Sequence, residues 1–463
     1  MNNINNVFFK KNYFYIETYG CQMNIYESDA IASLLLKSGL CLTKDIYKCD
    51  IFFINTCSIR EKAEIKIFNR LKYLNLIRKN KNPNMIICIL GCMSERIKNN
   101  FFLKEKKLFD IVISPKDYKS IINIIFSKLD INIRNFTNII LEQDIQNNIN
   151  SDRIFGNNIT SFVSIMQGCD NMCTFCVVPF TRGREISRSP KIILEECKIL
   201  YNKGFKEITL LGQNVDSYFW YGGGLKKNYK NIKKVKTVDF SNLIELIAKS
   251  IPIRIRFTTS NPHDFSEKIL KIMKKYKNIC NHIHLPVQSG SNKILKKMNR
   301  KYSREEYIYL INKIRQYIPD CSISHDIISG FCGETEEDHI DTLNLMNYVK
   351  YNYGYMFYYS PRQGTIASKK YKDDVNKKIK KRRLQEIIFL QKKHSFFRIK
   401  QQIGTIQEVL IEGISKKNNE YFYGRNSKNT MVYFKKVKNI VYGDLVKVLI
   451  KYGNYSNLIG KII

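Results

Sequence analysis

The sequence contains no run of about 18 apolar residues, so no membrane-spanning helix is expected. The opening residues, MNNINNVFFKKNYFYIETYG, lack the basic segment and following apolar stretch of a secretory signal peptide. We therefore expect a cytoplasmic protein that does not contact membranes. Because that compartment is reducing, the 13 cysteines do not predict a disulfide framework. We expect some of them to bind metal or take part in catalysis and the rest to be buried in the core.

Acidic residues are scarce: 41 Asp and Glu stand against 77 Lys and Arg, which leaves a formal net charge of +36. An excess of this size favours a polyanionic partner, such as nucleic acid or an anionic membrane surface. A general drift of composition toward Lys, Asn, Ile and Tyr, as an AT-rich genome produces, would give the same excess. The charge therefore agrees with RNA binding but does not establish it.

The hydrophobic pattern divides the chain into three regions. Residues 13–129 and 155–397 alternate strand-like and helix-like segments, which predicts two α/β domains. The polar, Asn-rich stretch 130–150 between them reads as a linker. From residue 400 to residue 463 the pattern has period two, which predicts a small antiparallel β-barrel, a fold that often binds oligonucleotides.

In the first region three cysteines each follow a strand-like run and precede a helix-like one. The runs FYIETYG, IFFINT and MIICILG lead to Cys21, Cys57 and Cys92. The spacing of about 35 residues is that of a βα unit. In a doubly wound sheet the strands are parallel, so their carboxyl ends share one edge, where ligands bind. We therefore expect the three thiols to meet at one rim.

The second region contains six strand candidates separated by helical stretches, which predicts an incomplete (βα)6 barrel with its site at the carboxyl ends of the strands. Polar side chains follow these strands and are expected to contact a cofactor, although structural capping explains any one of them nearly as well. They are Gln213, Asn214, Ser260, Gln288, Ser289 and Asp326.

The stretch GCDNMCTFC, which begins at Gly168, holds three cysteines without a histidine: Cys169, Cys173 and Cys176. Structural zinc prefers four ligands in two close pairs, and this spacing does not supply them. Thiolates are the usual ligands of a [4Fe–4S] cluster. Three of them hold three irons and leave the fourth open, where the amino and carboxylate groups of S-adenosylmethionine can bind. One electron then cleaves the sulfonium and releases a 5′-deoxyadenosyl radical.

The same motif and others resemble the radical S-adenosylmethionine methylthiotransferase family over nearly the whole chain. The matching strings are YGCQMN, NTCSIREKA, LGCMSER, GCDNMCTFCVVPFTRGREISR, LLGQNV, RIRFTTSNP, HLPVQSGSNKIL, GFCGETEED and SPRQGT. The tail resembles a TRAM domain, which binds RNA. NTCSIREKA and CVVPFTRGREISR are closest to the branch of the family that modifies tRNA adenosine.

The resemblance implies a methylthiotransferase amino-terminal domain, a radical-enzyme barrel and a TRAM domain. It implies conversion of N6-(dimethylallyl)adenosine at tRNA position 37, beside the anticodon, into its 2-methylthio derivative. Cys169, Cys173 and Cys176 would hold the radical cluster, with the aromatic Phe175 beside them. Cys21, Cys57 and Cys92 would hold a second [4Fe–4S] cluster that carries sulfur. A reductant protein, a sulfur donor and a monomeric enzyme are also expected.

Basic and aromatic residues supply the candidate RNA contacts, which are Arg182, Arg184, Tyr421, Tyr423, Arg425 and Lys428. For the two residues after the cluster loop, Arg182 and Arg184, a solvated turn is the alternative reading. The chain departs from the family at Cys332, Gln363 and Ile366, where the family usually has prolines that shape loops. We expect these changes to affect the rigidity of the loops rather than the chemistry.

Three other functions stay open. Members of the same family modify an aspartate of a ribosomal protein or threonylcarbamoyladenosine in tRNA, and VVPFTRGREISR argues against both. A protein of another class, a non-enzymatic iron–sulfur RNA-binding sensor, would share the charge, the tail and the cysteines. It would make no 5′-deoxyadenosine when reduced in the presence of S-adenosylmethionine.

Overall fold

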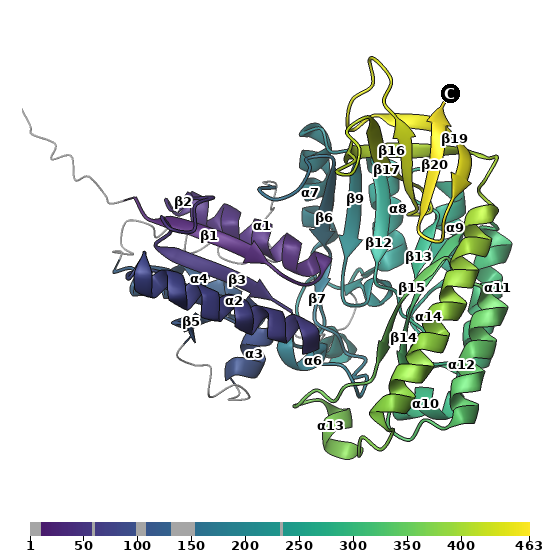
Figure 1. Ribbon diagram of the computed structural model, residues 1–463, viewed down its shortest axis with the longest axis horizontal. Helices are drawn as coiled ribbons and strands as arrows, with labels where there is room; N and C mark the ends of the chain where they lie inside the picture. The colour runs from purple at the N-terminus through teal and green to yellow at the C-terminus, as the bar shows by residue number, and fades with distance from the viewer. Residues whose placement is uncertain (1–10, 58–60, 99–107, 131–152, 232–234) are drawn as a thin grey trace, which may run out of the picture. The chain divides into compact units, whose positions relative to one another are not determined.

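The computed structural model forms two compact units (Figure 1). The first comprises the chain up to Phe155 together with Phe180–Arg182, and the second comprises Gly156–Pro179 and Gly183–Ile463. The second unit therefore holds both the barrel and the carboxyl-terminal domain. The predicted boundaries of three domains stay predictions, and the predicted linker lies almost wholly outside the described residues. The structure describes residues 11–57, 61–98, 108–130, 153–231 and 235–463.

A parallel sheet with strand order β2–β1–β3–β4–β5 forms the centre of the first unit. Its strands are β1 (Tyr13–Thr18), β2 (Cys41–Leu42), β3 (Ile51–Thr56), β4 (Ile86–Gly91) and β5 (Ile111–Val112). The helices around it are α1 (Gln22–Lys37), α2 (Glu61–Asn80), α3 (Cys92–Lys98), the short 3-10 helix η2 (Pro115–Ser120) and α4 (Ile121–Lys128).

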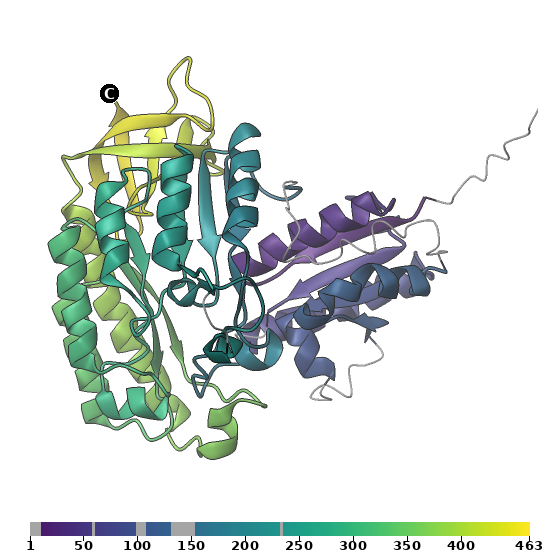
Figure 2. The ribbon, with the colours of Figure 1, turned by 180° about the vertical axis from the view of Figure 1, so that it is seen from behind.

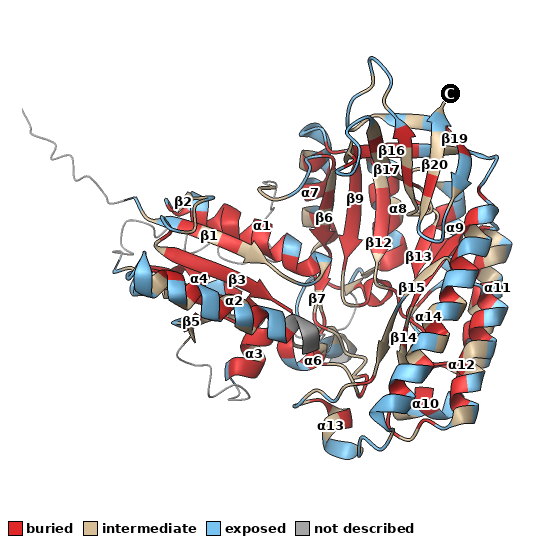
Figure 3. Ribbon diagram, viewed as in Figure 1, coloured by how far each residue is buried: buried red, intermediate tan, exposed pale blue. Residues whose placement is uncertain are grey.

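Both faces of this sheet are covered, because alternate strand residues point to opposite sides. Phe14 and Phe53 pack with apolar residues of α1 and α4 on one face. Phe52 and Ile54 pack with α2 and α3 on the other. Figure 3 shows the central strand β3 buried along its length. A parallel sheet covered on both faces confirms the doubly wound fold predicted for this region.

Six parallel strands in chain order form the open barrel of the second unit. They pair as two three-stranded sheets, β6–β9–β12 and β13–β14–β15, joined by a single parallel bridge between Ile255 and Ile279. All six predicted strands are confirmed. They are β6 (Thr160–Ser164), β9 (Glu207–Leu211), β12 (Arg254–Thr258), β13 (His282–His284), β14 (Ser322–Ser329) and β15 (Tyr353–Tyr358).

Helices cover the outside of these strands, as both ribbon views show (Figures 1 and 2). Three of the helices start at reciprocal capping boxes built by Asp239, Ser303 and Thr335, which satisfy their first backbone N–H groups. The helices of this region are α7 (Pro190–Asn202), α8 (Phe240–Ser250), α9 (Glu267–Lys275), α10 (Asn292–Lys297), α11 (Arg304–Tyr317), α12 (Glu336–Val349) and α14 (Lys377–Lys400). Two short helices, α6 (Val178–Thr181) and α13 (Ile366–Lys370), lie in loops. Short elements in the loops are β7 (Met166–Gln167), β8 (Ile186–Ser187), η4 (Val215–Ser217), β10 (Phe219–Trp220), η5 (Lys226–Asn231) and β11 (Val238–Asp239).

The tail forms a closed five-stranded barrel in the order β16–β17–β18–β20–β19, which confirms the predicted small barrel. Its pairs are antiparallel except for the parallel pair β18–β20. The strands are β16 (Ile406–Ile414), β17 (Tyr421–Asn426), β18 (Met431–Lys435), β19 (Leu445–Gly453) and β20 (Asn457–Ile462).

The small barrel is attached where the strands of the large barrel begin. Arg254, the first residue of β12, donates to the backbone carbonyl of Arg425 at 3.3 Å. Arg256 in the same strand donates to the backbone carbonyls of Asn426 at 2.7 Å and Ser427 at 3.1 Å. Glu207, the first residue of β9, holds the same guanidinium at 2.9 Å. The small barrel therefore sits at the opposite end of the strands from their carboxyl-terminal mouth.

Candidate cluster and cofactor sites

The first unit gathers Cys21, Cys57 and Cys92 at the carboxyl ends of three adjacent strands, β1, β3 and β4. Cys21 is the N-cap of α1, and Cys92 is the first residue of α3. The backbone approaches closely here: at Gly20, with φ +115°, an added Cβ would lie 2.4 Å from the Cβ of Cys57. Strand order and chain geometry thus place the three thiols at one rim, as expected.

Two buried asparagines, which we did not predict as site residues, hold this rim together. The side-chain amide of Asn24 donates to the carbonyls of Tyr19 and Thr56 at 3.0 and 2.9 Å. Asn55 donates to the Asn24 carbonyl at 2.9 Å. Both asparagines are fully buried. They lie inside the motifs YGCQMN and NTC, so the motif strings were the only available signal.

Arg182 lies in the same rim rather than on the surface. Its Nε donates to the Sγ of Cys92 at 3.2 Å, and its Nη atoms pair with the carboxylate of Glu27. Burial disfavours charge on Arg182, but Cys92 and Glu27 outweigh it and raise its pKa. Only 4% of the residue is exposed. This contradicts the expectation that Arg182 contacts RNA phosphate, because the structure encloses the guanidinium.

Replacing Arg182 by methionine is expected to lower the free energy of unfolding of the first unit by about 3–5 kcal/mol, because Glu27 is left buried without a cation. The double variant Arg182→Met, Glu27→Leu should recover much of that loss. Hydrogen exchange at the amides of β3 and β4, on metal-free protein, reports the stability of this unit separately. Lys98→Met serves as the control, because its pair with Asp117 is exposed and a loss of about 1 kcal/mol or less is expected. A single variant as stable as the control would show that the buried pair does not stabilise this rim.

The cysteine loop of the second unit is anchored by the segment that follows α10. Thr174 donates through its backbone N–H to the carbonyl of Met298 at 3.0 Å. Asn299 donates to the carbonyls of Asn171 and Met172 at 3.1 and 3.0 Å. Arg300 donates to the Sγ of Cys173 at 3.3 Å. Residues more than a hundred positions away in sequence therefore shape the loop.

The three thiols of this loop lie close enough to influence one another's ionisation. Burial, together with the neighbouring Cys173, raises the pKa of Cys169 to about 12. Burial also raises the pKa of Cys176, with added contributions from Cys173 and Cys169. Without metal, Cys169 and Cys176 are therefore protonated thiols, and loading a cluster must release their protons.

The donor set of both trios is thiol alone, which is the ligand chemistry of an iron–sulfur cluster. Within the described ranges, no three His, Cys, Asp or Glu side chains converge as ligands of one metal ion. A [4Fe–4S] cluster binds each thiolate to a different iron, so its ligands need not converge on a point. Each trio also has a guanidinium on one sulfur, Arg182 on Cys92 and Arg300 on Cys173, which offsets thiolate charge.

Polar strand-end groups divide into two kinds. Ser260 donates to Asp216 at 3.2 Å, and Ser289 lies 3.4 Å from the hydroxyl of Thr342, so both take part in structural hydrogen bonds. Three of the other side chains each have a buried oxygen that accepts no hydrogen bond from any described residue. They are the side-chain oxygens of Gln213 (Oε1), Asn214 (Oδ1) and Asp326 (Oδ1).

Unsatisfied buried acceptors cost free energy, so a ligand that donates to them is expected. S-adenosylmethionine carries an ammonium and two ribose hydroxyls, which are donors of the kind that such oxygens accept from. The Oδ1 of Asp326 also lies 3.5 Å from the Nε2 of His284. Gln288 is buried at a positive φ of +71°, a conformation that its loop imposes. Phe175 packs beside an apolar cluster that contains Phe331 and Tyr359, so packing explains it without a ligand.

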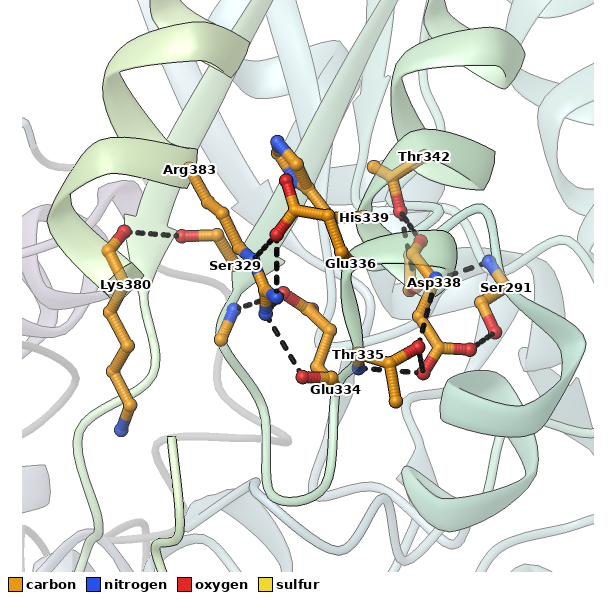
Figure 4. Close-up of polar contacts among 12 residues, drawn as sticks. Ser291, Ser329, Glu334, Thr335, Glu336, Asp338, His339, Thr342, Lys380 and Arg383 are labelled. Carbon is orange, nitrogen blue, oxygen red and sulfur yellow. Dashed lines mark hydrogen bonds and ion pairs between the residues drawn. The ribbon is translucent and has the colours of Figure 1, made fainter. Parts of the chain in front are cut away.

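The loop after β14 is fixed by α14, as Figure 4 shows. Arg383 donates to both the carbonyl and the carboxylate of Glu334 at 3.0 Å. Hydrogen bonds from Arg382 and Arg383 lower the pKa of Glu336 to about 2. Ser329, at the end of β14, donates to the Lys380 carbonyl at 3.3 Å. The first turns of α14 therefore belong to the mouth of the barrel.

The remaining predicted RNA contacts are partly engaged within the protein. Lys428 has only 15% of its side chain exposed and pairs with Asp320 of the large barrel at 3.1 Å, which contradicts a role as a free cation. The side chain of Arg425 is 3.8 Å from the carboxylate of Glu412. Arg184 pairs with Asp170 at 2.8 Å and stays exposed. Tyr421 and Tyr423 are half-buried on β17.

Three families match successive parts of the chain. The Radical SAM superfamily matches residues 163–346, the Uncharacterized protein family UPF0004 matches residues 13–114, and the TRAM domain matches residues 400–463. A solved structure of the radical S-adenosylmethionine methyltransferase TsrM from Kitasatospora setae shares the fold, with a TM-score of 0.55 and 12% identity over 78% of this chain and 77% of that one. The fold and site therefore define a radical S-adenosylmethionine enzyme with a TRAM domain. Membership of that superfamily implies a [4Fe–4S] cluster and S-adenosylmethionine.

Curated relatives narrow the class. The tRNA-2-methylthio-N(6)-dimethylallyladenosine synthase of Karelsulcia muelleri is 54% identical over 98% of this chain and 99% of its own length. The enzyme of the same name from Flavobacterium johnsoniae is 53% identical over 94% and 91%. The chain belongs to the tRNA-2-methylthio-N(6)-dimethylallyladenosine synthase family, the transferase branch that the sequence motifs resembled. Among the described residues, no helix is both long enough and apolar enough to cross a membrane.

Proposed function

We propose that this chain converts N6-(dimethylallyl)adenosine at position 37 of tRNA into 2-methylthio-N6-(dimethylallyl)adenosine. The observation that carries the proposal is the presence of two cysteine trios, each without a fourth protein thiol in its motif. The first lies at the carboxyl ends of three parallel strands, and the second lies in one loop that follows β6 and β7. Similarity to synthases of the same name along nearly the whole chain supports it.

In this proposal Cys169, Cys173 and Cys176 hold one [4Fe–4S] cluster. With S-adenosylmethionine bound, that cluster supplies the electron that cleaves the sulfonium and starts hydrogen abstraction. Gln213, Asn214 and Asp326 accept hydrogen bonds from the bound cofactor. The loop anchors around Arg300 keep the cysteines in place.

Cys21, Cys57 and Cys92 hold the second cluster, which carries the sulfur to be inserted. Arg182 orients the Cys92 thiolate and balances its charge, and Glu27 fixes the guanidinium. The reaction also needs a reductant protein and a sulfur donor. We expect the enzyme to act as a cytoplasmic monomer on the anticodon stem-loop.

Nucleoside analysis of tRNA tests the proposal. Cells that lack the protein should accumulate the unthiolated N6-(dimethylallyl)adenosine and lose its 2-methylthio derivative, and the cloned gene should restore it. Persistence of the methylthio nucleoside in the deleted strain would refute the assignment. Incubation of the reconstituted enzyme with tRNA and, separately, with ribosomes distinguishes this substrate from the ribosomal one. Nucleoside analysis of the treated tRNA then distinguishes it from threonylcarbamoyladenosine.

A further inference from the structure

One face of α14 carries exposed rings and lysines that neither candidate site uses. Phe389, Lys393, Phe396 and Lys400 follow one another at helical spacings of three and four, so they share a face, and Lys392 lies beside them. Phe389 is 61% exposed and Phe396 is 41% exposed. Tyr455, in the turn between β19 and β20, is 55% exposed. We call these six residues the α14 strip.

The opposite face of α14 is already occupied. Gln391 hydrogen-bonds His325 at 2.8 Å and the carbonyl of Tyr351 at 3.0 Å. Near the amino end Arg383 binds the loop shown in Figure 4. Near the carboxyl end Arg398 donates to the carbonyl of Lys350 at 2.6 Å. These contacts fix the helix, so its exposed face is held in one orientation.

Rings rather than carboxylates hold the lysines of the strip. The ammonium of Lys393 lies 4.4 Å from the ring centre of Phe389, that of Lys400 lies 4.7 Å from Phe396, and that of Lys392 lies 5.6 Å from Tyr455. A ring attracts and orients an ammonium without neutralising it. Arg382, by contrast, is neutralised by Glu336 and Glu386.

The surroundings of the strip carry charge of one sign. α14 contains ten basic residues and a single acidic one, Glu386, which is already bound to Arg382 and His339. From Leu445 to the carboxyl terminus there is no acidic residue. Within the described residues the structure shows no ion pair for Lys392, Lys393 or Lys400. Unneutralised cations held in a row match a row of phosphates.

Position along the helix identifies which part of an RNA would lie there. The amino end of α14 is at the mouth of the barrel, where Lys380 meets Ser329, and its carboxyl end is where β15 begins, near Lys350. At about 1.5 Å per residue, the strip begins about 14 Å from that mouth and extends about 17 Å farther. An RNA whose modified base enters the mouth would meet the strip with a more distant part.

We propose that the α14 strip binds the phosphate backbone of the substrate tRNA outside the anticodon arm. This rests on the proposed function, because it requires tRNA to be the substrate. The lysines contact phosphates without reading sequence, and the rings hold them in position. Because Tyr455 belongs to the small barrel, the strip spans the small and the large barrel.

The test compares two triple variants of the full-length protein for binding to full-length tRNA between about 0.1 and 1 M salt. The strip variant is Lys392→Gln, Lys393→Gln, Lys400→Gln. The control is Lys268→Gln, Lys271→Gln, Lys274→Gln, which removes the same charge from exposed positions of α9. Thermal melting confirms that both variants are folded.

We expect the strip variant to lose about tenfold or more in affinity at low salt and to reduce the slope of log affinity against log salt by about 2 to 3, because three phosphate contacts are lost. Its KM for tRNA should rise while kcat stays unchanged. The control should change the slope by less than about 1, and a stem-loop of only the anticodon arm should bind both variants alike.

A slope equal to that of the wild type, or an equal loss in the control, would overturn the proposal for the strip alone. So would sedimentation that shows a wild-type dimer and a monomeric strip variant with unchanged tRNA binding, because the strip would then join two copies. If the wild type itself failed to bind and modify tRNA, the proposed function would fall as well.

Discussion

Replacement of Cys173 by alanine is expected to reduce 5′-deoxyadenosine formation from S-adenosylmethionine to the level without enzyme. A cluster with two protein thiolates in place of three loses one of its anchors and the orientation of its open iron. Cys173 is also the thiol that Arg300 contacts at 3.3 Å, and it influences the ionisation of both neighbouring cysteines. It is therefore the central thiol of the loop.

Anaerobic reconstitution, reduction and chromatographic measurement of 5′-deoxyadenosine give the readout. Cys41→Ala is the matched control, since Cys41 is a half-buried cysteine on the short edge strand β2 and belongs to neither trio. It should retain wild-type yield. If the Cys173→Ala enzyme still produced 5′-deoxyadenosine at the wild-type rate, the loop would not hold the cluster that cleaves S-adenosylmethionine.

Replacement of Cys57 by alanine is expected to separate the two activities: 5′-deoxyadenosine is still formed, but no methylthio product appears. Cys57 follows β3 in the first unit, which has its own cores on both faces of its sheet. Its loss leaves the loop, anchors and strand ends of the second unit unchanged. This variant should therefore cleave S-adenosylmethionine without forming the methylthio product.

The same assay mixture, with tRNA added, measures both products. Cys57→Ala should yield 5′-deoxyadenosine within about twofold of wild type and methylthio product at background, a difference that a stability loss alone does not produce. Normal methylthio product from this variant would contradict a role for the first trio. Failure of both activities together would contradict the division of labour between the trios.

Local patterns were sufficient to predict the elements that bring the cysteines together. In the first region each cysteine directly follows an apolar run, and in parallel α/β folds the carboxyl ends of strands share an edge. The six strands of the large barrel were predicted from the same alternation and are all present. Period-two runs after residue 400 gave the five-stranded barrel.

Contacts between distant segments were not predictable from such patterns. The sequence shows Arg182 in a basic turn after the cluster loop, but not that Glu27 and Cys92 enclose it. Lys428 was expected to face RNA, yet the small barrel docks so that Asp320 binds it. Arg300 stands far from the cysteine loop in sequence and was not singled out. In each case tertiary packing, and not the local sequence, determines which residue the side chain contacts.

The central claim is that two separate sets of three cysteines each hold a cluster. An iron and acid-labile sulfide count on anaerobically reconstituted protein tests it most directly. We predict about eight irons and eight sulfides per wild-type chain, and about four of each in a variant lacking Cys21, Cys57 and Cys92. About four irons in the wild type, unchanged in that variant, would contradict the claim.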